Sequence, residues 1–304
     1  MPQKQECRVD RAGPIAVDFE FTDDDFKRIR GLIQSHAGIY LGENKRAMVY
    51  SRLGRRLRKL GIASFREYLE RMESGTGAEL IAFINSLTTN LTYFYREMHH
   101  FAVLREFLQK GNLPWNSTIW SAGCSTGEEA YSIAMVLASA PRPRLQTGQI
   151  VASDIDTSVL EHAERGIYSE EHMKNVSPEA LKRFFLGGTG ENAGLVKVRP
   201  ELRRLVAFRQ INLHDSRWPV RAPVKVIFCR NVMIYFDAPS RRRILERFGA
   251  VLDPGGLLFL GHSENVADMG EVFRPIGRTA YLRTDRRIAG QGGARAGNDG
   301  GSDE

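Results

Sequence analysis

The stretch Ile119-Trp-Ser-Ala-Gly-Cys-Ser-Thr-Gly-Glu-Glu-Ala-Tyr-Ser-Ile-Ala-Met-Val-Leu137 predicts a short buried strand, a glycine-containing turn and a helix. Gly123 and Gly127 let the backbone take positive φ angles and approach a bound molecule closely. Glu128 and Glu129 open the helix, where acidic side chains suit the helix dipole. The turn has neither the Gly-Lys-Ser/Thr of a phosphate loop nor the Gly-x-Gly-x-x-Gly of a dinucleotide site. It favours a nucleoside-like ligand that is not polyanionic, and a tight turn without a ligand is the alternative.

The next predicted strand, Gln149-Ile-Val-Ala-Ser-Asp154, ends in an acid. An acid at the carboxyl end of the second strand of a doubly wound sheet is placed to accept hydrogen bonds from both hydroxyls of a ribose. The alternative role for Asp154 is an ordinary helix N-cap, but Asp156 and Thr157 already suit that role for a helix that ends at Gly166. Asp154 is therefore predicted to bind the ligand.

The second half of the chain alternates predicted strands and helices, which is typical of an α/β fold with a doubly wound parallel sheet. These segments cover residues 119–122, 129–137, 150–154, 158–165, 224–229, 240–252 and 256–261. Residues 273–281 predict a terminal antiparallel pair. Between them, residues 187–190 and 194–198 and the run Leu205-Val-Ala-Phe208 predict short antiparallel strands, which would form a small β-subdomain inserted over about residues 187–208.

Residues 21–88 predict a separate, all-helical N-terminal domain. Its expected helices are one that Thr22-Asp-Asp-Asp25 caps, one from Asn44 to Gly61, one that Ser64-Phe-Arg-Glu67 caps, and one from Glu79 to Leu87. Residues 1–20 and 285–304 are predicted to be disordered because their composition gives them little to bury.

The second of these helices carries Arg52, Arg55, Arg56 and Lys59 along one face, at positions i, i+3, i+4 and i+7. Seven bases between Lys45 and Lys59 stand in a stretch without an acid. A solvated helix face is the ordinary explanation of such a run, and docking of an acidic partner is the alternative.

The chain has 304 residues and a formal net charge of +7. This length fits one large domain with a smaller companion, and the charge favours an acidic partner such as nucleic acid, an anionic membrane surface or an acidic protein. Cys7, Cys124 and Cys229 lack the paired spacing of a zinc site and the density of a secreted scaffold, so a reducing cytoplasm is expected. No signal peptide is apparent and no run approaches the ~18 apolar residues of a membrane span, so a soluble protein is expected.

The segment Thr88-Thr-Asn-Leu-Thr-Tyr-Phe-Tyr-Arg96 mixes polar residues with three aromatic ones and leads into a helix that ends at Gly111. Such a mixture suits neither a core nor a linker, so residues 89–111 are predicted to form a lid over the ligand, with a simple connector as the alternative. His99 and His100 are adjacent and would point about 100° apart on a helix. We therefore expect that they do not both bind one metal ion.

Five ordered segments together resemble the S-adenosylmethionine (SAM)-dependent methyltransferases of bacterial chemotaxis receptors, the CheR type. The segments are Leu87–Phe101, Trp120–Glu129, Ala152–Asp156, Ile227–Asp237 and Gly261–Asn265. The resemblance extends from about Phe21 to Arg283. It implies a Rossmann-like methyltransferase domain over residues 112–284, with SAM as cofactor, S-adenosylhomocysteine as product and no metal ion.

By this resemblance the cofactor contacts fall on Asn90, Thr92, Arg96, Glu129, Asp154, Asn212, Leu213, Arg230 and Asn231. Arg96 can pair with the methionine carboxylate of the cofactor, an acid in the first turn suits its amino group, and Asn212 can read the adenine edge. Glu128 stays open as an alternative to Glu129. Cys124 stands where the family is expected to have a small residue.

The substrate that the resemblance implies is a glutamate on a receptor helix, and the product is a glutamyl methyl ester. No general base is required, because a glutamate with a pKa of about 4.3 is already ionised at neutral pH. Catalysis then reduces to in-line positioning and desolvation. Tyr235 and Arg96 are the expected catalytic residues that fix the reacting groups, and simple packing of Tyr235 under the lid is the alternative.

The implied partners are methyl-accepting chemotaxis receptors. Their methylation helices would meet the basic helix face, and a C-terminal peptide could add as a strand to the β-subdomain. The expected protein is a cytoplasmic monomer that is recruited to membrane receptor arrays and does not bind nucleic acid. A nucleic-acid methyltransferase would explain the charge, but Arg230-Asn-Val-Met-Ile lacks the prolines usual for base-amino methylation. A non-catalytic SAM-binding docking protein would lose the lid, whereas Asn90, Thr92, Arg96 and Tyr235 are all present.

Overall fold

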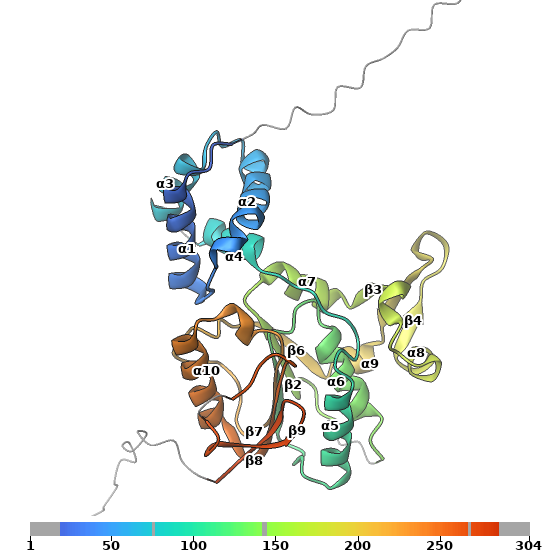
Figure 1. Cartoon of the computed structure of the whole chain (residues 1–304). Coiled ribbons are helices and arrows are strands. Elements are labelled where there is room, and N and C mark those ends of the chain that lie inside the picture. Colours follow the sequence, from blue (N-terminus) through green and yellow to red (C-terminus); the bar gives the residue numbers. More distant parts are fainter. Residues whose placement is uncertain (1–18, 75–76, 142–144, 267–268, 286–304) are drawn as a thin grey trace, which may run out of the picture. The chain divides into compact units, whose positions relative to one another are not determined.

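The computed structural model describes residues 19–74, 77–141, 145–266 and 269–285. Most of the two termini that we predicted to be disordered, and Cys7, therefore lie outside the described residues. The chain divides into two compact units, one formed by Met1–Gly31 and Gly42–Leu87 and the other by Leu32–Leu41 and Thr88–Glu304. Each unit is described by itself (Figure 1). No helix among the described residues is long and apolar enough to cross a membrane.

The first unit is helical, as the sequence predicts. Its elements are α1 (Asp23–Ala37), whose last turns belong to the second unit, η1 (Glu43–Lys45), α2 (Arg46–Leu60), α3 (Phe65–Ser74) and α4 (Ala78–Leu87). Thr22 and Asp25 cap α1 reciprocally, since the Asp25 N–H donates to Thr22 Oγ1 at 3.1 Å and the Thr22 N–H donates to Asp25 Oδ2 at 3.0 Å. Asn44 lies in η1, so α2 begins two residues later than we expected.

One basic residue of the α2 face is paired with an acid of another helix, which corrects the expectation of a face without acidic partners. Arg56 donates from Nε to Glu79 Oε1 of α4 at 3.0 Å and also forms an ion pair with that carboxylate, which accepts a further hydrogen bond from the Tyr68 hydroxyl at 2.8 Å. The expectation fails for Arg56 because the matching acid lies 23 positions away in sequence. Arg55 and Lys59 are exposed, and Arg52 is half-buried.

The second unit is built on a seven-stranded sheet in the order β6-β2-β1-β7-β8-β10-β9. Its strands are β1 (Thr118–Ala122), β2 (Ile150–Asp154), β6 (Val206–Gln210), β7 (Val224–Cys229), β8 (Leu252–Leu260), β9 (Phe273–Gly277) and β10 (Ala280–Arg283). The first five are mutually parallel, whereas β10 pairs antiparallel with both β8 and β9. The predicted doubly wound sheet and its terminal antiparallel pair are confirmed.

Helices cover both faces of this sheet (Figure 1). They include α5 (His99–Gln109), α6 (Glu128–Ala138), α7 (Thr157–Arg165) and α10 (Ala238–Val251). Successive side chains of a strand point to opposite faces, so Ile119 joins a core with α5, α6 and α7 while Trp120 joins a second core with α10. Both side chains are fully buried. The near-continuous apolar strands that the sequence shows follow from this double coverage.

The sheet reverses its strand order beside β1. From β1 the chain proceeds to β2 and β6 on one side, and it then returns to β7 on the other side. Ligands of open α/β sheets bind outside the carboxyl ends of the strands at such a reversal. The residues that follow β1, β2, β6 and β7 therefore meet at one edge of the sheet, which includes the turn at 123–127, Asp154, residues 211–213 and residues 230–235.

The small antiparallel sheet exists, but its boundaries differ from the predicted 187–208. It has the order β3-β5-β4, with β3 (Ile167–Ser169), β4 (Phe185–Gly187) and β5 (Leu195–Val198). Between and after these strands lie η2 (Glu170–Met173), α8 (Pro178–Phe184), η3 (Gly190–Asn192) and α9 (Pro200–Arg203). The run Leu205–Phe208 does not belong to it, because β6 pairs parallel with β2 as the edge strand of the main sheet.

Candidate functional site

The turn after β1 lies directly against the end of β2 and the loop after β7. The N–H groups of Gly123 and Cys124 both donate to Ser153 O, at 2.7 and 2.9 Å. Gly123 has a φ of +85°, and a Cβ there would lie 2.3 Å from Val232 Cγ2. Only glycine fits this position, because a side chain would both strain the backbone and strike Val232. Gly127, the N-cap residue of α6, also has a positive φ of 96°.

Asp154 ends β2 and faces the same turn. Its Oδ2 accepts a hydrogen bond from the Ser125 N–H at 2.9 Å, and its Oδ1 accepts one from the Asp156 N–H at 3.0 Å. Burial raises the pKa of Asp154 to about 6, against the opposing effect of these N–H donors. The N–H of Ile155 contributes a further hydrogen bond to this carboxylate. A carboxylate has about four acceptor positions, so capacity remains for a ribose hydroxyl. The predicted cap is confirmed, because Asp156 accepts a hydrogen bond from the Ser158 N–H at 2.9 Å.

Glu129 is the acid of the first turn that faces the strand reversal. Its Oε1 accepts a hydrogen bond from Ser121 Oγ of β1 at 2.6 Å, and its Oε2 accepts one from Arg230 Nε at 2.7 Å. Arg230 follows β7 and also donates from NH1 to Arg96 O of the lid at 2.6 Å. One buried arginine after β7 therefore links α6 to the segment before α5. The guanidinium of Arg230 is committed to these partners, so a cofactor contact of this residue would come from its backbone.

Glu128 points to a different part of the unit. Its Oε2 accepts a hydrogen bond from Thr126 Oγ1 at 2.6 Å, and its Oε1 lies 3.8 Å from Nδ1 of His172 in η2. Burial raises the pKa of Glu128. Because Glu128 faces the side of the small sheet while Glu129 faces β1 and β7, the geometry favours Glu129 as the acid at the site.

The segment before α5 is tied to the cofactor turn. Asn90 donates from Nδ2 to Asp156 Oδ2 at 2.7 Å, and its carbonyl accepts a hydrogen bond from Ser125 Oγ at 2.9 Å. Arg96 donates from NH1 to Leu91 O at 2.8 Å and lies 5.9 Å from the centroid of the Tyr93 ring. Thr92 is half-buried. These bonds hold Asn90 and Arg96 in place beside the turn, whereas their contacts with a cofactor stay predictions.

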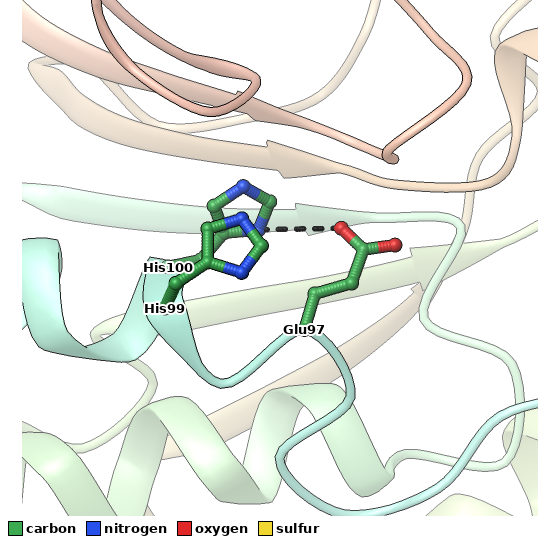
Figure 2. Close-up of side chains that lie close together, drawn as sticks. All are labelled: Glu97, His99 and His100. Atoms are coloured by element: carbon green, nitrogen blue, oxygen red, sulfur yellow. Dashed lines mark ion pairs between the residues drawn. The ribbon is translucent and has the colours of Figure 1, made fainter.

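Glu97, His99 and His100 lie close together at the start of α5 (Figure 2), and their potential ligand atoms lie within 4.8 Å of one another. The centroids of the two histidine rings are 4.1 Å apart. Our argument that His99 and His100 point too far apart to bind one metal ion is therefore wrong, because the potential ligand atoms of both lie close together. Two side chains that leave the first turn of a helix about 100° apart can still lean toward the same carboxylate.

These residues nevertheless fit a guanidinium better than a metal ion. Arg230 NH1 lies 3.2 Å from His100 Nδ1, so this nitrogen accepts, and His100 Nε2 lies 3.1 Å from Arg278 O. Burial and the charge of Arg230 lower the pKa of His100 to about 3, which keeps the ring neutral. A metal ion on Nδ1 would lie against the guanidinium. Glu97 Oε2 is buried without a hydrogen-bond partner among the described residues, 3.8 Å from Arg230 NH1.

The remaining predicted residues also lie at this edge of the sheet. The side chain of Asn212 donates from Nδ2 to His36 O at 2.7 Å and accepts from the His214 N–H at 2.9 Å, so one hydrogen of its amide remains for an adenine. Leu213 is buried. Tyr235 ends η4 (Met233–Tyr235) and is half-buried, with its carbonyl accepting from the Tyr40 N–H at 2.8 Å.

Sequence reasoning missed four residues that shape this site. Glu97, Ser121 and Ser125 are polar partners of residues that we had singled out. They lie in the segments Leu87–Phe101 and Trp120–Glu129 of the family resemblance, but they were given no role. Glu264 lies in the segment Gly261–Asn265, which also belongs to the family resemblance. An acid just after a buried strand was the available signal, and it was given no role.

A sheet of this order, with a glycine turn after the first strand and acids after the first and second strands, is typical of a Rossmann-like domain that binds a nucleoside-containing cofactor at the strand reversal. The family description "CheR methyltransferase, SAM binding domain" matches residues 90–282, and "CheR methyltransferase, all-alpha domain" matches residues 24–88. The chain belongs to the CheR methyltransferase family.

Curated relatives match over most of their length. The chemotaxis protein methyltransferase of Klebsiella aerogenes is 51% identical over 267 residues, which cover 88% of this chain and 91% of the relative. The chemotaxis protein methyltransferase of Escherichia coli is 49% identical over 86% of this chain and 91% of the relative. Chemotaxis protein methyltransferase 2 of Pseudomonas aeruginosa is 47% identical over 87% of this chain and 94% of the relative.

Proposed function

We propose that this chain transfers the methyl group of SAM to the side-chain carboxylate of glutamates on bacterial chemoreceptors. The family assigns SAM as the cofactor. The observation that best supports where SAM would bind is the carboxylate of Asp154. Its Oδ2 accepts a hydrogen bond from the Ser125 N–H of the glycine turn at 2.9 Å, and the carboxylate keeps acceptor capacity for a ligand. The relatives named as chemotaxis protein methyltransferases support a chemoreceptor as the acceptor.

The residues present fit the cofactor in three respects. Gly123 leaves a backbone surface that a Cβ would fill. Asp154 and Glu129 offer carboxylates to the ribose and to the amino group. Asn231 Oδ1 is buried without a hydrogen-bond partner among the described residues, and a ligand donor would satisfy it. When bound, the cofactor supplies an activated methyl group on a sulfonium.

The chain itself then contributes position and not acid–base chemistry. An acceptor glutamate is ionised at neutral pH, because its ordinary pKa is about 4.3. Its carboxylate needs to be desolvated and held in line with the methyl group, a role for which we propose Tyr235 and Arg96. Orientation of this kind alone supplies on the order of 7–11 kcal/mol of barrier reduction in well-aligned systems.

The direct test is incubation of the purified chain with methyl-labelled SAM and a membrane fraction that carries chemoreceptors, followed by mild alkali. A carboxyl methyl ester releases its label as methanol, whereas methylated amines and nucleic acid bases keep theirs. The proposal expects alkali-labile label on the receptor band. Alkali-stable label, or label on nucleic acid added in parallel, would reject it.

The way in which the receptor is bound is a second part of the proposal. The strand β4 lies at an edge of the small sheet, and an exposed edge strand can accept an extended peptide as a further strand. Leu186 and Leu195 are exposed on β4 and β5. A receptor C-terminal peptide at this edge would keep the enzyme at receptor arrays, and titration with tail peptides ending in aromatic residues tests it. Absence of binding at millimolar concentration would indicate tail-independent recognition.

A further inference from the structure

A buried carboxylate after β8 holds the loop that follows β7. Glu264 is only 6% exposed. Its Oε2 accepts hydrogen bonds from the Gly261 N–H at 2.6 Å and from the Asn231 N–H at 2.9 Å, and its Oε1 accepts one from the Ile234 N–H at 3.3 Å. The two oxygens of one side chain thus hold both ends of the segment from Asn231 to Ile234.

In this loop one residue has a left-handed backbone conformation, and the chain after β8 packs closely against it. Asn231 adopts a φ of +60°, in the left-handed region that is uncommon for residues other than glycine. A Cβ at Gly261 would lie 2.7 Å from Asn231 N and 2.8 Å from Glu264 Oε2, so the chain after β8 approaches the loop more closely than any side chain permits. Asparagine adopts the left-handed region more readily than most residues, and the hydrogen bond from its N–H to Glu264 holds Asn231 in that conformation.

A buried carboxylate at this place lowers the stability of the fold unless its two acceptor oxygens have a function. Burial raises the pKa of Glu264, and the N–H groups of Gly261, Asn231 and Ile234 oppose that effect. Well-packed apolar residues often replace buried charges without loss of stability. What an apolar side chain cannot do is accept three N–H groups at once and so fix the direction of the loop.

We propose that Glu264 is a positioning residue for methyl transfer, which fixes the loop so that Asn231 and Tyr235 meet the cofactor and the acceptor carboxylate. Oε1 bonds the residue directly before Tyr235, and Oε2 bonds Asn231, the residue with the orphaned buried acceptor. This inference rests on the proposed function for its kinetic consequence. Its structural consequence, restriction of the Asn231 and Ile234 amides, does not depend on methyl transfer.

Glu264→Gln separates these two bonds. Its remaining carbonyl oxygen can serve Gly261 and Asn231, but its NH2 group then faces the Ile234 N–H, so the bond next to Tyr235 is lost. A displacement of ~1 Å in a positioned group costs on the order of a hundredfold in rate. We expect Glu264→Gln to lower kcat by about tenfold to a hundredfold, with a much smaller change in the dissociation constant for SAM. Glu264→Asp, which keeps the charge on a shorter stem, should recover part of this loss.

The kinetic arm uses two comparisons. Val272→Ala removes apolar volume from the same core and leaves the three hydrogen bonds of the Glu264 carboxylate in place, so it reports what a loss of stability alone does to kcat below the unfolding temperature. In a Tyr235→Phe background, Glu264→Gln should have little further effect, because both changes act through the same hydroxyl. A wild-type kcat in Glu264→Gln, a loss equal to that of Val272→Ala, or full additivity with Tyr235→Phe would each overturn the proposal.

The structural arm needs no receptor. Amide hydrogen exchange of Glu264→Gln should show faster exchange at Ile234, with Asn231 still protected. Unchanged exchange at Ile234 would overturn the proposal whatever the kinetics show. If the wild-type chain methylates no receptor but Ile234 exchange rises as expected, the proposed function fails while the role of Glu264 in holding the loop stands.

Discussion

Arg230 Nε donates to Glu129 Oε2 at 2.7 Å, and both side chains are buried, with exposures of 2% and 8%. Glu129 lies in the first turn of α6 and Arg230 follows β7, so this ion pair joins the two elements on either side of the strand reversal. The same guanidinium contacts the carbonyl of Arg96 and the ring of His100. The segment before α5 and the first turn of α6 therefore share one buried cation.

Removal of that cation should be strongly destabilising. Arg230→Met leaves Glu129 as an uncompensated buried charge, and we expect a loss of about 3–5 kcal/mol in the free energy of unfolding, measured by denaturant titration. The double variant Arg230→Met/Glu129→Gln should recover part of this loss, because the orphaned charge is then gone. Arg242→Met breaks an exposed pair with Glu246 and should cost only about 0–1 kcal/mol. Equal losses in Arg230→Met and Arg242→Met would contradict this account of the ion pair.

Cofactor binding should depend on the ionisation of Asp154. Burial raises the pKa of Asp154 to about 6 in the folded chain, above its ordinary value, so the folded state binds this proton more tightly than the unfolded state does. The resulting contribution to stability is present at low pH and is lost as pH rises through about 6. Ribose hydroxyls prefer the ionised carboxylate, so SAM affinity should fall about tenfold between pH 7.5 and pH 5.

Asp154→Asn tests the same group without a change of pH. A neutral acceptor in place of the carboxylate should weaken SAM binding by about 1.5–3 kcal/mol in calorimetry. The variant should also lose the dependence of affinity on pH, because it has no proton to exchange at this position. Wild-type affinity in Asp154→Asn would remove Asp154 from the site, and an unchanged pH dependence would assign the titration to another group.

The structural features around the candidate site that the sequence predicted correctly are those with a local cause. A glycine that must take positive φ, an acid at a strand end and an Asp156 N-cap all depend on residues a few positions apart. The pairing of Arg56 with Glu79, and of β6 with β2, depends on distant segments. The apolar pattern of Leu205-Val-Ala-Phe208 fits a strand of an inserted hairpin as well as a parallel edge strand. Only the strand with which it pairs determines which of the two it forms. The hydrogen bonds of Glu264 to the N–H groups of Asn231 and Ile234 also join segments that are distant in sequence.

Tyr235 should matter for turnover more than for binding. Its proposed hydroxyl contact orients the reacting groups and does not hold the cofactor in the ground state, so Tyr235→Phe should lower kcat and leave the SAM dissociation constant nearly unchanged. Single-turnover kinetics and calorimetry on the same preparation separate the two quantities. An unchanged kcat would return Tyr235 to a packing role under the lid.

The basic face of α2 should act through charge alone. With Arg56 already paired, we expect Arg55 and Lys59 to attract the acidic methylation helices of a receptor. Arg55→Glu/Lys59→Glu should raise the KM for receptor strongly, leave SAM binding nearly intact and flatten the salt dependence of methylation, since exposed charges are screened over about 10 Å at 0.1 M salt.

A matched control for this prediction is Lys27→Glu/Arg66→Glu, which makes the same change in net charge at exposed bases of α1 and α3. If α2 docks the receptor, the control should change the KM far less. Equal effects of the two double variants would mean that net charge, and not this face, steers the encounter. Wild-type receptor kinetics in Arg55→Glu/Lys59→Glu at low salt would mean that the face is only solvated.

The most direct measurement is transfer of label from SAM to two forms of one chemoreceptor, the natural receptor and a variant in which the glutamates of the methylation helices are replaced by glutamine. Side-chain carboxylates are the proposed acceptors, so we predict label on the natural receptor and none on the glutamine form. The carboxylate of Asp154, which we propose to bind the ribose of SAM, should be required for that label. Equal labelling of both receptors would contradict the central claim that this chain forms glutamyl methyl esters.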